Sequence, residues 1–119
     1  MSPPSGPEKQ FFDRLAAGSF DIQRCAECAK HVFYPRVLCP HCGGGRLDWV
    51  AASGRGTVYS TTVVRRKSAD GGDYNVCLVD LAEGPRMMSR VAGLAPGEVK
   101  IGMPVKARIA EGLVEFVAA

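Results

Sequence analysis

The sequence predicts a mostly β protein in which a short N-terminal helix and a metal-stabilised ribbon precede a small β-barrel. Three observations support this fold class: two Cys-x-x-Cys pairs at residues 25–28 and 39–42, a series of short β-rich runs after residue 46, and glycine or proline turns between those runs. The chain has 119 residues, enough for one compact domain or for a very small domain beside a modest one. We divide it into a disordered tail and helix over residues 1–18, a ribbon over 19–47 and a barrel over 48–119.

Residues 1–7 are rich in proline, serine and glycine and are expected to be disordered. A short helix is predicted over residues 8–17, because Phe11, Phe12 and Leu15 gather on one side and Gly18 follows where a helix C′ glycine would stand. A single helix of about ten residues is unstable alone, so it must pack either on this chain or on a partner. We take Phe11, Phe12 and Leu15 as the candidate partner-facing patch, because large exposed apolar clusters usually mark interfaces.

The four cysteines of the two pairs, Cys25, Cys28, Cys39 and Cys42, are the candidate metal ligands. Each pair bends a turn that points two sulfurs at one spot, and two such turns supply the four thiolates of a tetrahedral zinc site. Because protein fills all four positions, we predict one structural zinc rather than a catalytic metal with an open position. An iron tetrathiolate would use the same ligands and stays an alternative.

From residue 47 onward the predicted elements are strands. They cover residues 47–50, 57–66, 74–81, 86–92, 103–110 and 113–117, with a further β-rich run at 31–34 between the two cysteine pairs. Five or six short strands in about 70 residues favour a five-stranded Greek-key barrel of OB-fold size. Cys77 lies between two apolar residues of one predicted strand and is expected to be a buried small hydrophobe rather than a nucleophile.

The composition is that of an ordinary globular protein, with 46% hydrophobic and 23% charged residues. No apolar run approaches the roughly 18 residues that span a membrane, and the N-terminus lacks the apolar segment of a secretory signal. We therefore expect a cytoplasmic protein without a membrane partner, in a reducing compartment where paired cysteines bind metal. The formal charge of +3 falls to about +1 when four thiolates bind one Zn²⁺, so nucleic acid is not an expected partner.

Several motifs follow one another in a specific order. They are Gln23-Arg24-Cys25, Tyr34-Pro35-Arg36, a Gly-x-Gly-Thr-Val-Tyr-Ser run at residues 54–60, Glu83-Gly84-Pro85-Arg86 and Ile101-Gly102-Met103-Pro104. This set covers about residues 10–111 and resembles the zinc-ribbon/OB-fold family once catalogued as domain of unknown function thirty-five (DUF35). The resemblance implies an N-terminal helix, a rubredoxin-like zinc ribbon and a C-terminal OB-fold. One departure is Ala29 after the second cysteine, where such ribbons often have glycine; a non-glycine residue adopts that turn at small cost.

The resemblance also implies a non-catalytic, zinc-binding accessory subunit that works beside a thiolase-like or lipid-transfer-protein-like enzyme on acyl-CoA. In that setting Arg55, Arg65, Arg66 and Lys67 are candidates for holding the phosphates of coenzyme A, since guanidinium groups bind phosphate in a bidentate manner. No Ser-His-Asp set can be assembled with confidence, and no glycine-rich phosphate loop precedes a predicted helix. Both observations support a binding role.

Two other functions stay open. A nucleic-acid-binding module is one, since OB-folds and zinc ribbons both bind nucleic acids, and a rubredoxin-like electron carrier with iron is the other. Trp49, Tyr59 and Tyr74 are the side chains that would stack on a base, although we expect them in the core or at the barrel rim. His31 and His41 flank the cysteine turns and are expected at the surface.

Overall fold

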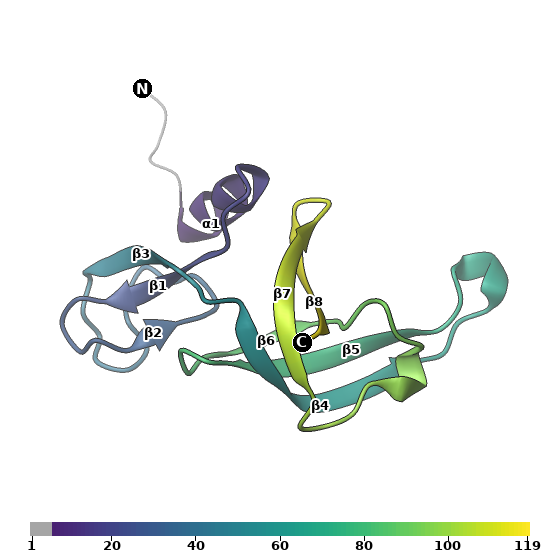
Figure 1. The fold of residues 1–119 in the computed structure, drawn as a ribbon. Coiled ribbons are helices and arrows are strands. Elements are labelled where there is room, and N and C mark those ends of the chain that lie inside the picture. The colour runs from purple at the N-terminus through teal and green to yellow at the C-terminus, as the bar shows by residue number, and fades with distance from the viewer. Residues whose placement is uncertain (1–5) are drawn as a thin grey trace.

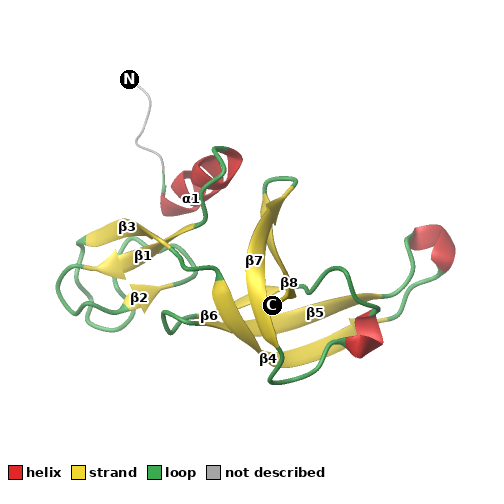
Figure 2. Ribbon diagram, viewed as in Figure 1, coloured by secondary structure: helices red, strands yellow, loops and turns green. Residues whose placement is uncertain are grey.

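The computed structural model describes residues 6–119; residues 1–5, part of the predicted disordered tail, lie outside the described residues. The N-terminal part holds helix α1 (Pro7–Ala16) and a three-stranded sheet of β1 (Asp21–Cys25), β2 (His31–Val32) and β3 (Leu47–Ala51), in the order β2-β1-β3 (Figure 1). The C-terminal part is a five-stranded sheet of β4 (Arg55–Val64), β5 (Tyr74–Leu81), β6 (Arg86–Ser89), β7 (Pro104–Ala110) and β8 (Leu113–Ala118), in the order β6-β5-β4-β7-β8. Two 3₁₀ turns, η1 (Ser68–Asp70) and η2 (Pro96–Glu98), lie in loops between strands (Figure 2). The predicted mostly β fold class is confirmed.

Helix α1 begins and ends where local chemistry allows. Pro7 occupies the first turn, where its missing N–H costs no hydrogen bond. At the other end Gly18 has a φ of 91°, its N–H donates to the Leu15 carbonyl, and the Ser19 N–H donates to the Arg14 carbonyl, both at 2.9 Å. This is the Schellman arrangement that glycine favours, as the sequence predicted.

The predicted partner-facing patch on α1 needs correction for two of its three members. Phe11 is 3% exposed and Leu15 is 2% exposed, so both side chains are buried within the chain itself. The Phe11 ring meets Phe33 edge-on, with ring centroids 5.5 Å apart. A ten-residue helix cannot hold its structure alone, and packing this apolar side against the ribbon is what stabilises it. Phe12 is half-buried and keeps some accessible surface.

Strand β3 belongs to the ribbon and not to the barrel. It pairs with the whole of β1, from Asp21 opposite Ala51 to Cys25 opposite Leu47. The sequence placed residues 48–50 at the start of the barrel, because spacing alone does not show which strand is the partner. The chain passes from the three-stranded ribbon sheet to the five-stranded barrel sheet between Ala51 and Arg55. The run 33–34 also differs from expectation, since β2 ends at Val32.

Hydrogen bonds close the five-stranded sheet into the OB-fold barrel. β4 pairs with both β5 and β7, and a bulge midway along β4 lets this long strand bend. The edge beyond β6 closes through a parallel bridge between Val91 and Phe116 on β8. The Phe116 N–H donates to the Arg90 carbonyl at 2.9 Å, and the Ala92 N–H donates to the Phe116 carbonyl at 2.7 Å.

Asn75 on β5 holds the same closing segment from the other side. Its side chain is buried; Nδ2 donates to the Val91 carbonyl at 2.8 Å and Oδ1 accepts from the Val91 N–H at 2.9 Å. A side-chain amide therefore replaces the backbone ladder at this point of the barrel. The barrel core is apolar and includes Ile22, Val58, Cys77, Val79, Leu81, Val105 and Phe116.

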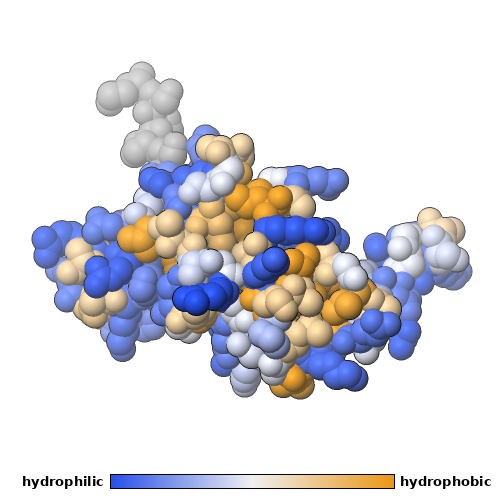
Figure 3. All heavy atoms as spheres, viewed as in Figure 1, coloured by the Kyte–Doolittle hydropathy of each residue, from blue (hydrophilic) through white to orange (hydrophobic). Residues whose placement is uncertain are grey.

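The space-filling view shows apolar surface in the middle of the molecule, where α1 and the barrel approach each other, with mostly polar surface toward both ends (Figure 3). Between residues 6 and 119, no helix has the length and apolar character needed to cross a membrane.

Candidate metal centre and surface clefts

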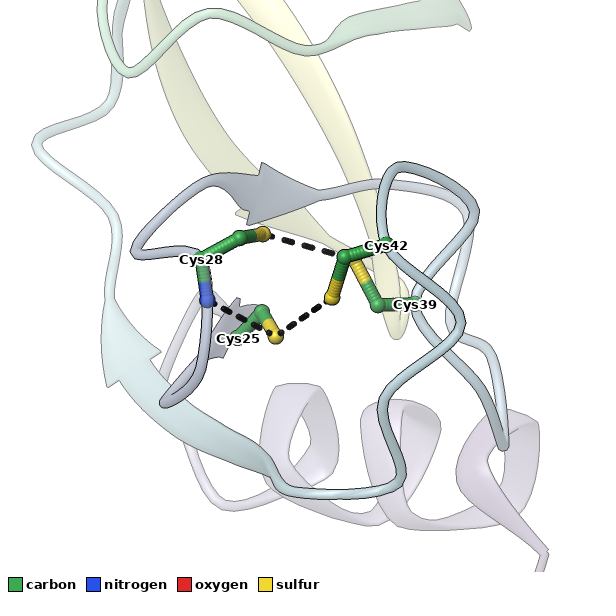
Figure 4. A group of neighbouring side chains, drawn as sticks. All are labelled: Cys25, Cys28, Cys39 and Cys42. Atoms are coloured by element: carbon green, nitrogen blue, oxygen red, sulfur yellow. Dashed lines mark hydrogen bonds between the residues drawn. The ribbon is translucent and has the colours of Figure 1, made fainter.

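The four candidate ligands converge on one spot of the ribbon (Figure 4). All four sulfur atoms lie within 4.8 Å of one another. The Cys25 and Cys42 sulfurs are 3.6 Å apart, and the Cys28 and Cys39 sulfurs are 3.7 Å apart. These separations agree with the value of about 3.8 Å that a tetrahedral site with Zn–S bonds of about 2.3 Å requires. They are far longer than a disulfide bond, which measures about 2.05 Å.

Two matching turns place the sulfurs. The Ala29 N–H donates to the Cys25 carbonyl at 2.9 Å, and the Gly43 N–H donates to the Cys39 carbonyl at 2.8 Å. Ala29 and Gly43 both have positive φ, 66° and 78° respectively. Ala29 thus adopts the left-handed conformation that glycine holds in the second turn, and the first turn keeps its shape despite the different residue.

The sulfurs influence one another strongly. Hydrogen bonding from the Cys28 N–H lowers the pKa of the Cys25 thiol to about 7, although burial acts in the opposite direction. The Gly44 N–H lowers the pKa of Cys42, but the hydrogen bond with the Cys25 sulfur and burial outweigh it and raise that pKa to about 12. Neighbouring sulfurs resist ionising together, and a dication among them removes that resistance. The donor set and its spacing therefore fit a structural zinc.

Two of the sequence motifs meet in space beside this centre. Gln23 on β1 is buried, and its amide makes two hydrogen bonds to the backbone of Arg36: Nε2 donates to the carbonyl at 2.8 Å and Oε1 accepts from the N–H at 2.6 Å. In the same loop the Tyr34 O–H donates to Glu8 Oε1 at 2.6 Å, which raises the pKa of Tyr34. These hydrogen bonds attach the ribbon loop at residues 34–36 to β1 through Gln23 and to α1 through Glu8.

The structure does not gather the four cations predicted to hold phosphate. Arg55 begins β4, whereas residues 65–67 follow the end of this ten-residue strand. A rise of about 3.3 Å per residue separates the two groups by on the order of 30 Å. Arg65 is also paired with Asp73 at 2.7 Å, and this contact holds the pKa of the Asp73 carboxyl below its usual range. Arg55 and residues 65–67 therefore do not form one cluster in the structure, and phosphate binding by either group stays a prediction.

Each aromatic side chain considered for stacking on a base already has a guanidinium group over its ring. The pairs, with the distance from guanidinium carbon to ring centroid, are Arg14 on Trp49 (5.1 Å), Arg66 on Tyr74 (4.5 Å) and Arg86 on Tyr59 (3.4 Å). Each of these cation–π contacts covers one face of its ring and closes that face to a stacked base. The three rings contribute to the structure of the chain itself.

Cys77 is a core residue, as predicted. It is 1% exposed, and its Sγ lies 3.2 Å from Asn75 Oδ1. Both histidines of the chain are in the ribbon: His31 is half-buried on β2 and His41 is exposed in the second cysteine turn. This arrangement offers Cys77 a side-chain amide rather than a base, so it gives no activated nucleophile.

Two adjoining hollows were missed by sequence reasoning. The first, which we call the apolar groove, has a volume of about 340 Å³ and is lined by Phe12, Phe33, Met88 and Leu113 among others. The second, which we call the basic cleft, has a volume of about 630 Å³ and lies between residues 29–33 and 40–41 of the ribbon and residues 83–86 of the barrel. No sequence pattern predicts either hollow, because segments far apart in the chain form their walls.

The sequence matches two family descriptions that together span most of the chain. Residues 12–48 match "ChsH2, rubredoxin-like zinc ribbon domain", and residues 49–110 match "ChsH2, C-terminal OB-fold domain".

Several curated proteins are similar to this chain. The "Probable enoyl-CoA hydratase alpha subunit" of Thermomonospora curvata is 43% identical over 86 residues, and the "3-oxo-4,17-pregnadiene-20-carboxyl-CoA hydratase alpha subunit" of Mycobacterium tuberculosis is 36% identical over 111 residues. These matches cover 71% and 90% of this chain but only 27% and 35% of the two relatives. A "DUF35 domain-containing scaffold protein" of Methanothermobacter thermautotrophicus is 31% identical over 87 residues, covering 70% of this chain and 65% of that protein.

Two solved structures share the architecture. A chain of the structure described as "Ltp2-ChsH2(DUF35) aldolase" aligns with a TM-score of 0.78 and 33% identity, covering 98% of this chain and 96% of that chain. A DUF35-family protein of unknown function from Sulfolobus solfataricus aligns with a TM-score of 0.73 at 19% identity, covering 97% of this chain and 87% of that chain, and shows the fold alone.

Proposed function

Because the chain belongs to the ChsH2-type DUF35 family of zinc-ribbon and OB-fold proteins, we propose that it is a non-catalytic accessory subunit of an acyl-CoA-processing enzyme. In this proposal it binds a thiolase-like or lipid-transfer-protein-like subunit and helps to bind or present the acyl-CoA substrate. One observation carries the proposal: the chain corresponds over nearly its whole length to a chain of an assembly whose description pairs a ChsH2 DUF35 part with Ltp2.

The metal centre has a structural role in this proposal. Cys25, Cys28, Cys39 and Cys42 hold one zinc, which supplies charge compensation for four thiolates. The ribbon buries little apolar surface, with Cys25, Val32 and Cys39 as its buried cluster, so metal binding contributes much of its folding energy. The metal thereby fixes the ribbon against which α1 packs.

The local chemistry supports a binding role over a catalytic one. Cys77 is enclosed in the core, and neither histidine lies outside the ribbon. Three of the similar proteins are called scaffold proteins, although others are called hydratase subunits. Catalysis in the assembly therefore falls to the partner subunit.

The proposal is tested by capturing partners with the tagged, zinc-loaded full chain from an extract of its own cells. A thiolase-like enzyme bound in a fixed molar ratio, identified by mass spectrometry, is the expected result. The matched control is the Cys39→Ser chain, which keeps the tag but lacks an intact ribbon. Turnover of acyl-CoA by the captured enzyme is then measured with and without added chain.

Other outcomes contradict the proposal. Nuclease-sensitive material in place of an enzyme, with binding that weakens steeply as salt rises, would support a nucleic-acid-binding module. A red protein with visible thiolate-to-iron charge-transfer bands and iron in place of zinc would support an electron carrier.

A further inference from the structure

We infer that the metal centre is also a site of reversible oxidation. A peroxide oxidises Cys42 first, a disulfide then joins Cys42 to Cys25, the zinc is released, and the ribbon no longer supports α1. This inference depends on the zinc-binding role of the four cysteines and goes beyond the proposed function, because it needs neither the partner nor the substrate.

Cys42 is the ligand that a solvent-borne oxidant reaches most easily. It is exposed, whereas Cys25 and Cys39 are 0% and 2% exposed. Glycines fill residues 43–45, so this segment adds no side chain over the sulfur. The Gly44 N–H donates to Cys42 Sγ at 3.4 Å, and a Cβ atom on Gly44 would lie 3.3 Å from the same sulfur. Because oxidation of cysteine follows thiolate character and exposure, Cys42 is the expected point of attack.

Cys25 is placed to complete the reaction. Its sulfur lies 3.6 Å from the Cys42 sulfur, across the space between the two cysteine turns (Figure 4). Cys25 itself is fully buried, so it meets the oxidised Cys42 and not the oxidant in solvent. An exposed sulfur beside a second thiolate is the arrangement in which a sulfenic acid is resolved to a disulfide.

The chemical steps use a peroxide as the oxidant. The Cys42 thiolate attacks a peroxide oxygen, so an S–O bond forms, the O–O bond breaks, and hydroxide takes up a proton to leave as water. The Cys25 thiolate then attacks the sulfur of the sulfenic acid, so an S–S bond forms, the S–O bond breaks, and a second hydroxide leaves as water. The two sulfurs lose two electrons, and hydrogen peroxide is reduced to two molecules of water.

The loss of two thiolates removes half of the zinc ligands. A disulfide sulfur is no longer a thiolate, so two of the four donors of a tetrahedral site are gone and the metal is released. The buried cluster of the ribbon consists of Cys25, Val32 and Cys39. Because this apolar core is so small, the ribbon is expected to lose its structure together with the metal.

The segment between the two cysteine turns carries this change to α1. In the reduced chain the Tyr34 O–H donates to Glu8 on α1 at 2.6 Å, and the Phe33 ring lies 5.5 Å from the Phe11 ring. A helix of ten residues is not stable without such support. Oxidation is therefore expected to release α1 and to remove part of the wall of the apolar groove, which Phe11 and Phe33 both line.

Peroxide treatment of the zinc-loaded full chain tests the inference. A zinc-binding dye measures metal release, and alkylation followed by mass spectrometry maps the thiols. We expect one zinc released for each Cys25–Cys42 disulfide, while Cys77, which is 1% exposed, stays reduced as an internal control. Trp49 fluorescence is expected to change in step with zinc release, because Trp49 Nε1 donates to Gln10 on α1 at 2.9 Å. A first disulfide between other cysteines, a disulfide formed with zinc retained, or no reaction in a molar excess of peroxide would overturn the inference.

Two glycine variants test access to Cys42. In the Gly44→Val chain the new Cβ covers the Cys42 sulfur, and the end of the exposed Glu27 side chain, which occupies that position, moves aside. Zinc release is expected to slow at least about fivefold. In the matched Gly45→Val chain the nearest atom to the new Cβ is Leu38 Cδ2 at 3.7 Å, and the rate is expected to stay within about twofold of the unchanged chain. Equal rates in the two variants would contradict attack at Cys42. If the Gly44→Val chain binds less zinc, the order of thiol modification in the unchanged chain decides.

Reversal distinguishes a switch from damage. Dithiothreitol with added zinc is expected to restore the zinc content and the Trp49 fluorescence, because thiols reverse a disulfide but not a sulfinic acid. Failure to recover would overturn the inference. Capture of an enzyme partner by the reduced chain is a separate readout, so a retained partner together with a metal centre that resists peroxide would overturn the inference and leave the accessory role standing.

Discussion

Asn75→Ala is expected to destabilise the barrel at its seam, where Val91, in the segment after β6, pairs with Phe116 on β8. The buried Asn75 side chain makes two hydrogen bonds to Val91, one to the carbonyl and one from the N–H, at 2.8 and 2.9 Å. Val91 is 2% exposed, so removal of the amide leaves one donor and one acceptor buried without their partner. The segment that closes β6 onto β8 is then held by its backbone hydrogen bonds to Phe116 and by the side-chain contacts of Ser89 and Arg90 with β8.

The magnitude follows from the number of groups left unsatisfied. Each buried polar group without a partner costs about 1–3 kcal/mol, so two groups cost about 2–6 kcal/mol. We expect about 3 kcal/mol, because water reaches part of the space that the truncated side chain vacates. An unfolding entropy of about 0.25 kcal/mol/K for a chain of this length converts this loss into a fall of about 12 °C in Tm.

Urea unfolding with zinc in excess provides the measurement. Far-UV circular dichroism reports the strands, and Trp49 fluorescence reports the ribbon separately because Trp49 lies on β3. Ser68→Ala, which truncates an exposed polar side chain in η1, is the control and is expected to change stability by less than about 0.5 kcal/mol. A loss below about 1 kcal/mol for Asn75→Ala would show that barrel closure does not depend on this amide.

Of three further predictions, two concern the metal centre and one concerns Glu115 on β8, which is paired with Arg108 at 2.7 Å and with Arg90, beside Val91, at 3.0 Å. The Cys39→Ser chain is expected to lose zinc and to unfold in the ribbon while the barrel strands survive. Metal analysis measures the zinc content and circular dichroism the remaining strands. Unfolding of both the ribbon and the barrel would contradict the prediction. Ala29→Gly is expected to raise stability by about 0.5 kcal/mol, because Ala29 holds a φ of 66°, whereas the same change at Ala26 should lower stability in thermal unfolding. The guanidinium group of Arg108, and to a smaller extent that of Arg90, holds the pKa of the buried Glu115 carboxyl below its usual range. The two ion pairs therefore contribute fully to the free energy of unfolding above about pH 4.3, and this contribution is lost as pH falls through the lowered pKa. The Glu115→Gln chain should show a smaller loss of stability between about pH 5 and 3 in urea unfolding, and an unchanged pH dependence would refute the role of this carboxylate.

The amino-acid sequence by itself determined the features that depend on local spacing. The Cys-x-x-Cys pairs specified four ligands, because two sulfurs three residues apart meet in one turn whatever surrounds them. Gly18 marked the end of α1, and the β-rich runs marked strands of the barrel, because backbone preference acts over a few residues. The ordered motifs also indicated the family, which the matches over residues 12–110 confirm.

Tertiary structure alone decided which distant segments meet. It buried the side chains of Phe11 and Leu15 and paired β3 with the ribbon sheet. It also separated Arg55 from Arg65, which lie at opposite ends of β4. It also brought Lys30, His41 and Arg86 to one cleft, although they lie in three segments of the sequence. The physical reason is the same in each case: burial and strand pairing are contacts between residues far apart in the chain, and local sequence preference carries no information about them.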